Sequence, residues 1–139
     1  MLAPKKVKYR KWHTMRKNPK KVGPATRGVT IAFGSHGIKA LAPMRIRSNQ
    51  IEAARKVLSK SIGKTGRLWI RIFPDMPYTS KPAEVKLGKG KGDLQGYVAQ
   101  VRAGTVIFEV DGVTDAVAKE ALRKAGTKLP VKVKIVTRM

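Results

Sequence analysis

Residues 49–73 read NQIEAARKVLSKSIGKTGRLWIRIF and contain the clearest helix and the clearest strand of the chain. In the first part, apolar side chains recur at the spacing of one helix face, at Ile51, Ala54, Leu58 and Ile62. Asn49 is a candidate N-cap with Glu52 as its capping-box partner, and Gly63 is a natural stop. In the second part, Leu68, Ile70 and Ile72 alternate with Arg67, Trp69, Arg71 and Phe73, which predicts a strand over residues 67–73 that ends at Pro74.

Weaker patterns on both sides of this stretch predict the remaining elements. Residues 29–33 and 38–41 predict a β-hairpin, and residues 45–47 a short strand. Residues 97–102 and 105–110 predict a second hairpin, turning at Ala103-Gly104. Thr114 can cap a second helix, which Gly126 ends and whose apolar face is Val117, Ala118, Ala121, Leu122 and Ala125. A last strand is predicted over residues 131–135. This order predicts an α+β fold, with two helices packed on a mostly antiparallel or mixed sheet.

The charge of the chain points to a polyanionic partner. Its 139 residues suffice for one domain with a core, and they carry a formal net charge of +23. Such an imbalance destabilises a free compact domain through like-charge repulsion, so the expected partner is a nucleic acid, with an anionic membrane surface as the second candidate. Because 42% of the residues are hydrophobic, the chain is not a wholly disordered basic tail. We expect a folded body, residues 29–139, with basic extensions.

The first extension is an arm, residues 1–28, which contains no acidic residue and little apolar periodicity. We expect it to be extended, and mobile when free of a partner. Aromatic side chains that can stack on unpaired bases are interleaved with its cations. The alternative is a solvated charged tail. The predicted RNA-binding residues of the arm are Lys5, Lys6, Lys8, Tyr9, Arg10, Lys11, Trp12, His13, Arg16 and Lys17.

The second extension is a long basic loop, predicted at about residues 75–96 because no periodicity is visible there. Within it, residues 86–92 read KLGKGKG, where glycines let the backbone approach a phosphate and lysines supply charge. The run lacks the spacing of a nucleotide-binding P-loop, and a plain surface linker is the alternative. The predicted ligand-contact residues here are Lys81, Lys86, Gly88, Lys89, Gly90, Lys91 and Gly92.

Three arginines of the body are further RNA-binding candidates. Arg55 lies at the edge of the apolar stripe of the first helix, where its fork could reach a phosphate or pair with Glu52. Arg67 and Arg71 flank Trp69 on one face of the predicted strand. Trp69 itself could stack on RNA, but we favour packing of Trp69 and Phe73 under the helices.

Nothing in the sequence predicts catalysis, a metal site or a cofactor. The chain has no cysteine, and two histidines without cysteines make a poor set of metal ligands. Its carboxylates are scattered along the sequence. No apolar run is long enough for a membrane helix, and no secretory signal follows the first methionine. A general nucleic-acid-binding protein of the nucleoid type, an enzyme acting on RNA phosphates and a cationic membrane-surface protein remain as alternatives to a structural RNA-binding protein.

Several motifs in the same order resemble the bacterial-type large-subunit ribosomal protein L-sixteen family, over nearly the whole chain. The motifs are PKKVKYRK (4–11), QIEAAR (50–55), WIRIFPD (69–75), KPAE (81–84), GKGKG (88–92), FE (108–109) and KLPVK (128–132). The resemblance implies an α/β-hammerhead type of fold and a structural role in the large ribosomal subunit.

The resemblance also implies the partners. They are 23S rRNA near the central protuberance and the peptidyl-transferase region, tRNA in the A site with the P site as a second candidate, and neighbouring large-subunit proteins. By its position the loop would face the tRNA. We therefore expect a cytoplasmic ribosome, or an organellar one, as the location, with no membrane, no cofactor and no stand-alone homo-oligomer.

Overall fold

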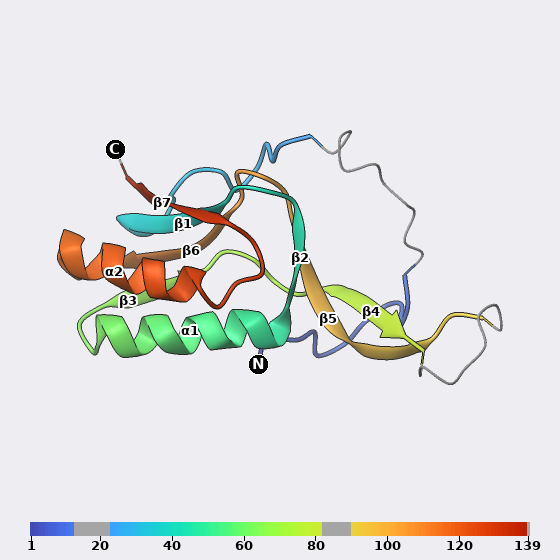
Figure 1. Cartoon of the computed structure of the whole chain (residues 1–139). Helices are drawn as coiled ribbons and strands as arrows, with labels where there is room; N and C mark the ends of the chain where they lie inside the picture. Colours follow the sequence, from blue (N-terminus) through green and yellow to red (C-terminus); the bar gives the residue numbers. More distant parts are fainter. Residues whose placement is uncertain (13–22, 82–89, 139) are drawn as a thin grey trace.

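The computed structural model describes residues 1–12, 23–81 and 90–138. In these residues, two helices and seven strands follow one another along the chain (Figure 1). Their order is β1 (His36–Ala40), β2 (Met44–Arg47), α1 (Ser48–Ile62), β3 (Arg67–Ile70), β4 (Met76–Ser80), β5 (Asp93–Val101), β6 (Val106–Asp111), α2 (Asp115–Gly126) and β7 (Val133–Thr137). The predicted α+β class is confirmed.

The strands form two antiparallel sheets, whereas the sequence predicted one. The first has the order β3-β6-β1-β7 and the second the order β2-β5-β4. The predicted hairpin at Ala103-Gly104 is therefore wrong, because β5 and β6 belong to different sheets. The turn itself exists: the N–H of Thr105 donates to the carbonyl of Arg102, and Gly104 has a φ of 98°. It carries the chain from one sheet to the other.

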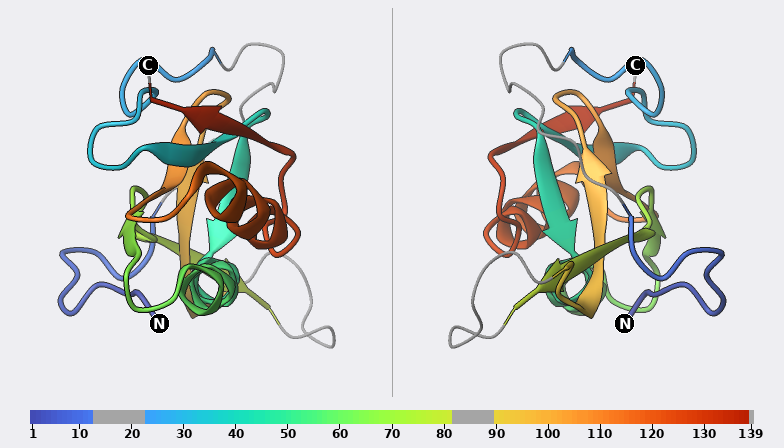
Figure 2. Two further views of the ribbon diagram at one scale, coloured as in Figure 1. Left: turned by 90° about the vertical axis from the view of Figure 1, so that its left-hand side faces the viewer. Right: turned by 90° about the vertical axis from the view of Figure 1, so that its right-hand side faces the viewer.

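The core lies between the helices and the first sheet, and Ile46 of β2 and Ala99 and Val101 of β5 extend it into the second sheet. On α1, the predicted residues Ile51, Ala54, Leu58 and Ile62 are buried. On α2, the buried residues are Ala118, Ala121, Leu122 and Ala125, but Val117 is 41% exposed and its assignment to the apolar face is wrong. The two helices pack against each other, as Figure 2 shows end-on. They share one apolar cluster with Ile38 of β1 and with Phe108 and Val110 of β6.

The helix starts agree with the sequence in one case only. Thr114 caps α2 by accepting a hydrogen bond from the N–H of Val117, as predicted. The N-cap of α1 is Arg47 and not Asn49, and Gln50 closes the capping box by accepting from the N–H of Arg47 at 2.9 Å. The helix starts earlier than predicted because β2 runs directly into it. Glu52 pairs with Arg55 instead of capping the helix.

Residues 29–33 form no strand, so the first predicted hairpin is also wrong. The N–H groups of Ala32, Phe33 and Gly34 all donate to one carboxylate oxygen of Glu109, at 3.0, 2.8 and 2.9 Å. Strand β1 pairs with β6 and β7 instead. A side chain far along the chain thus takes the hydrogen bonds that a neighbouring strand would have taken.

The strand predicted over residues 67–73 ends at Ile70. Its face that carries Arg67 and Trp69 points away from the helices. Trp69 is in register with Glu109, which lies between the helix-facing Phe108 and Val110. The side chain of Trp69 therefore points to the other side of the sheet, where it stacks on Phe33. Phe73 is 47% exposed. The prediction that Trp69 and Phe73 pack under the helices is wrong.

Both ends of the predicted loop at residues 75–96 are strands. Strands β4 and β5 pair with each other and extend away from the helices (Figure 1). The sequence did not indicate a strand here because Pro77 lies within β4, and proline usually marks a loop. Strand β4 lies at the edge of the second sheet, where proline is tolerated. The last strand begins at Val133 rather than at Val131. None of the described helices is both long and apolar enough to cross a membrane.

Candidate RNA interface

The described part of the arm, residues 1–12, is extended and forms no helix or strand. Leu2 packs against the core cluster, which fixes the start of the segment on the body. From residue 5 to residue 12 every side chain is exposed, including all the predicted RNA-binding residues of this part: Lys5, Lys6, Lys8, Tyr9, Arg10, Lys11 and Trp12. The predicted residues His13, Arg16 and Lys17 lie outside the described part of the chain.

The aromatic residues of the arm lie among its cations, as the sequence predicted. The ammonium group of Lys8 lies 5.6 Å from the centroid of the Tyr9 ring. Tyr9 is 63% exposed and Trp12 is 37% exposed. Exposed rings beside exposed cations have the chemistry needed to stack on bases and neutralise phosphates.

The base of the predicted loop meets the arm. Lys91 donates a hydrogen bond from its ammonium group to the carbonyl oxygen of Trp12. Lys81, Gly90 and Gly92 flank it at the ends of β4 and β5, while Lys86, Gly88 and Lys89 lie outside the described residues. A Cβ at position 92 would lie 2.6 Å from the carbonyl oxygen of Ser80, so only glycine fits there. The described members of the two predicted contact sets thus meet at Lys91 and Trp12.

Arg55 holds its fork against a carboxylate of the same helix. Its Nε and one terminal nitrogen donate to the two oxygens of Glu52, at 3.0 and 2.5 Å. The hydrogen bond with Arg55 lowers the pKa of Glu52, and the bond with Glu52 raises the pKa of Arg55. The alternative role weighed for Arg55, an ion pair, is therefore present, and its contact with RNA stays a prediction.

Arg67 and Arg71, predicted alike, have different surroundings. Arg67 is exposed at the start of β3. Arg71 forms an ion pair with Glu109, whose side chain is fully buried, and its own side chain is only 20% exposed. Burial alone would raise the pKa of Glu109, but hydrogen bonds from the Gly34 N–H and from Arg71 outweigh it and lower that pKa. Arg71 thus stabilises a buried charge, and an RNA contact by its remaining surface stays a prediction.

Sequence reasoning missed two basic residues on the second sheet. Arg45 and Arg47 of β2 are exposed on either side of the buried Ile46. The guanidinium of Arg47 lies 5.5 Å from the centroid of the Tyr78 ring, which belongs to β4. The signal was available, since two arginines that alternate with a buried isoleucine indicate a strand with a basic outer face.

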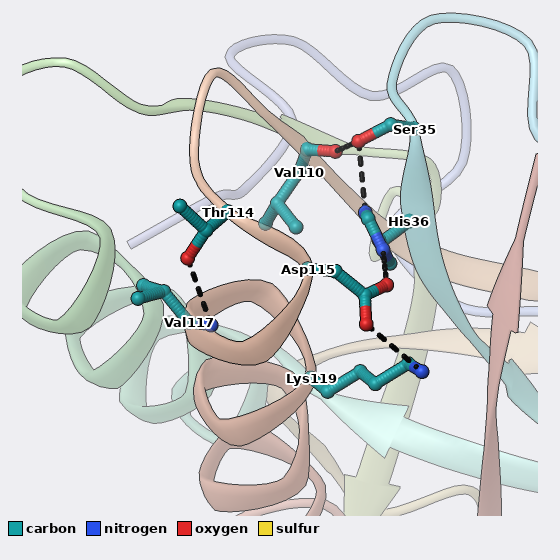
Figure 3. Close-up of polar contacts among 7 residues, drawn as sticks. All are labelled: Ser35, His36, Val110, Thr114, Asp115, Val117 and Lys119. Carbon is teal, nitrogen blue, oxygen red and sulfur yellow. Dashed lines mark hydrogen bonds and ion pairs between the residues drawn. The ribbon is translucent and has the colours of Figure 1, made fainter.

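A polar chain of serine, histidine and aspartate connects β1 to α2 (Figure 3). The ring of His36 lies 2.8 Å from the Ser35 hydroxyl and 2.7 Å from the Asp115 carboxylate. Asp115 also pairs with Lys119 at 3.0 Å, and the hydrogen bond with His36 is the main reason that its pKa is lowered. The hydroxyl of Ser35 also contacts the carbonyl of Val110, so these hydrogen-bonded side chains join the first sheet to the start of α2. The described residues contain no group of three or more potential metal ligands.

Comparison with known proteins identifies the sequence family. The sequence pattern that defines the family "Ribosomal protein L16p/L10e" matches residues 4–136. The chain belongs to this family. Membership in the L16p/L10e family confirms the resemblance drawn from the motifs, and it makes the chain a structural ribosomal protein of the translation machinery rather than an enzyme.

Curated L16p/L10e relatives match over nearly their full length. The chain is 52% identical to the large ribosomal subunit protein uL16 of Rhodopseudomonas palustris strain BisB18, over 100% of this chain and 98% of the relative. It is 50% identical to the uL16 protein of Zymomonas mobilis, over 100% of this chain and 94% of the relative. It is 52% identical to the uL16 protein of Thermosipho melanesiensis, over 99% of this chain and 94% of the relative.

Proposed function

We propose that this L16p/L10e protein is a constituent of the large ribosomal subunit that binds 23S rRNA through its arm and contacts tRNA through its loop. One observation carries the rRNA part. In the described residues, the ion pairs connect carboxylates to cations of the body, and none includes Lys5, Lys6, Lys8, Arg10 or Lys11. The exposed cations of the arm therefore lack a partner within this part of the chain, and rRNA phosphates supply one.

The position within the subunit follows from the family resemblance. We place the rRNA contacts near the central protuberance and the peptidyl-transferase region, with neighbouring large-subunit proteins around the body. The contact of Lys91 with Trp12 supports one continuous surface, because it joins the base of the loop to the arm. In this arrangement the arm holds rRNA, and the loop beyond β4 and β5 reaches tRNA in the A site, with the P site as a second candidate.

Salt dependence of binding tests the rRNA part. If roughly eight phosphates are neutralised, log K for 23S rRNA falls against log salt with a slope of about −6 to −7. Replacing Lys5, Lys6 and Lys8 by alanine should reduce that slope by about 2 to 3. The matched control changes three exposed lysines of the body, Lys124, Lys128 and Lys132, and should leave the slope unchanged. A slope near −1, or equal binding to duplex DNA, would favour a general nucleic-acid-binding protein.

Alanine at Lys86, Lys89 and Lys91 tests the tRNA part. Lysine is a compact charge on a flexible stem, which suits a phosphate that arrives and leaves in each cycle. The variant should enter subunits normally and bind A-site tRNA more weakly, with a loss that shrinks as salt rises. Failure to enter subunits, or normal tRNA binding once there, would show that the loop has another role.

A further inference from the structure

An aromatic pair outside the arm and the loop joins the exposed Phe33 to Trp69 of β3, which is partly buried. Phe33 stacks on Trp69 with 6.1 Å between ring centroids and 19° between ring planes. The guanidinium of Arg71 lies 5.1 Å from the centre of the Phe33 ring. Phe33 nevertheless stays 56% exposed. A ring covered on both faces would expose little more than its edge, so this exposure indicates one face open to solvent.

The backbone that carries Phe33 is held by a buried charge. Glu109 accepts the N–H groups of residues 32, 33 and 34 with one oxygen and pairs with Arg71 through the other. Its side chain has no exposed surface. These bonds attach the segment to β6 from both sides of Phe33. Because this backbone is already fixed, the Phe33 ring loses little conformational freedom when a ligand stacks on it, which favours binding.

The charge around the pair selects the ligand. Arg67 is exposed on the same face of β3 as Trp69, and the chain as a whole carries +23. We propose that Phe33, backed by Trp69, is a stacking platform for an unpaired base of rRNA. The inference rests on the proposed rRNA binding and adds a site that reads a base face instead of phosphate charge. Any base can stack in this way, because each has a π face.

Affinity of the full-length chain for purified 23S rRNA tests the platform, measured at several salt concentrations. Phe33→Leu keeps apolar bulk and removes the ring, and Phe33→Tyr keeps the ring. The matched control is Phe73→Leu, since Phe73 is 47% exposed and makes no aromatic stack among the described residues. We expect Phe33→Leu to weaken binding about 5- to 150-fold, the equivalent of one base stack, while Phe33→Tyr and Phe73→Leu bind as the parent does.

Salt separates stacking from charge. The loss in Phe33→Leu should persist at every salt concentration with an unchanged slope, because no cation is removed. Equal affinity of Phe33→Leu and the parent would overturn the platform while leaving the rRNA proposal intact. Absence of rRNA preference in the parent chain would instead overturn the proposed function. Normal rRNA affinity of Phe33→Leu with poor entry into subunits would assign this face to a protein neighbour and likewise overturn the platform.

Ultraviolet crosslinking of the unaltered chain gives a second test that does not depend on how variants fold. An aromatic ring stacked on a base is positioned for a zero-length crosslink. We expect rRNA crosslinked to the peptide that contains Phe33 and not to the one that contains Phe73. Equal crosslinking of both peptides, or of neither, would contradict the platform.

Discussion

Glu109→Gln tests whether one buried carboxylate holds residues 32–34 on the first sheet. Glutamine has nearly the same shape and keeps an oxygen that can accept the N–H groups of Ala32, Phe33 and Gly34. It removes the negative charge that faces Arg71, whose side chain is only 20% exposed. The substitution therefore leaves a largely buried guanidinium without its counter-charge.

The expected loss follows from that geometry. Removing one partner of a buried ion pair costs about 3–5 kcal/mol, and we expect the lower end because glutamine keeps the acceptor. Unfolding entropy is about 2.1 cal/mol/K per residue, so for this chain a loss of about 3 kcal/mol lowers Tm by about 10 °C. Replacing Arg71 by methionine in the same chain removes the orphaned charge, and the double variant should recover part of the loss.

Thermal unfolding followed by tryptophan fluorescence, at high salt to suppress self-repulsion, measures the effect. The matched control is Glu120→Gln, which breaks another Glu–Arg pair, with Arg123, in which both side chains are more than half exposed. Its Tm should not change, because exposed pairs contribute little. Equal Tm values for Glu109→Gln and the parent would refute the view that this carboxylate fixes the segment.

Three further predictions concern pH, close packing and RNA. The pKa of Glu109 is lowered from its ordinary value of 4.5, so this carboxylate stabilises the folded state fully above pH 4.5 and loses that effect as pH falls through the lowered pKa. On acidification, Tm should therefore fall less steeply in Glu109→Gln than in the parent. Gly34→Ala puts a Cβ 2.6 Å from the carbonyl oxygen of Val110 and should cost about 1–3 kcal/mol in denaturant unfolding, whereas Gly23→Ala, with no atom within 4 Å, should be neutral. Arg55→Lys keeps the charge but loses the fork and should weaken rRNA binding more than Lys60→Arg does; affinity equal to that of the parent would show that the fork serves Glu52 alone.

Local patterns predicted the elements well where local physics decides them. The apolar stripe of α1, its stop at Gly63 and the cap at Thr114 all depend on side chains within a few positions of one another. Val117 was assigned wrongly because the helical spacing that places it beside the stripe does not tell how wide the covered face is.

Strand partners could not be predicted from such patterns. Residues 97–102 and 105–110 alternate and meet at a glycine turn, yet they enter different sheets. Glu109 looks like an ordinary outward position of a strand. Its partners lie 38 and 75–77 positions away, so no local signal shows that it is buried.

The candidate interface was predictable in its charge and not in its details. Exposure of the arm cations follows from their density, and the structure agrees for residues 5–12. Arg71 was read as an outward cation because its pairing partner lies in a distant strand. Phe33 was placed in a strand, and its stack on Trp69 depends on the Glu109 contact that the sequence does not reveal.

Sedimentation tests the central claim, that this chain is an rRNA-binding constituent of the large ribosomal subunit, most directly. A tagged copy expressed in cells is followed through a sucrose gradient at high magnesium. We predict that it migrates with the large subunit and the intact ribosome, and that alanine at Lys5, Lys6 and Lys8 shifts part of it to the free fraction. A tagged parent chain that stays at the top of the gradient, or that migrates only with the small subunit, would contradict the claim.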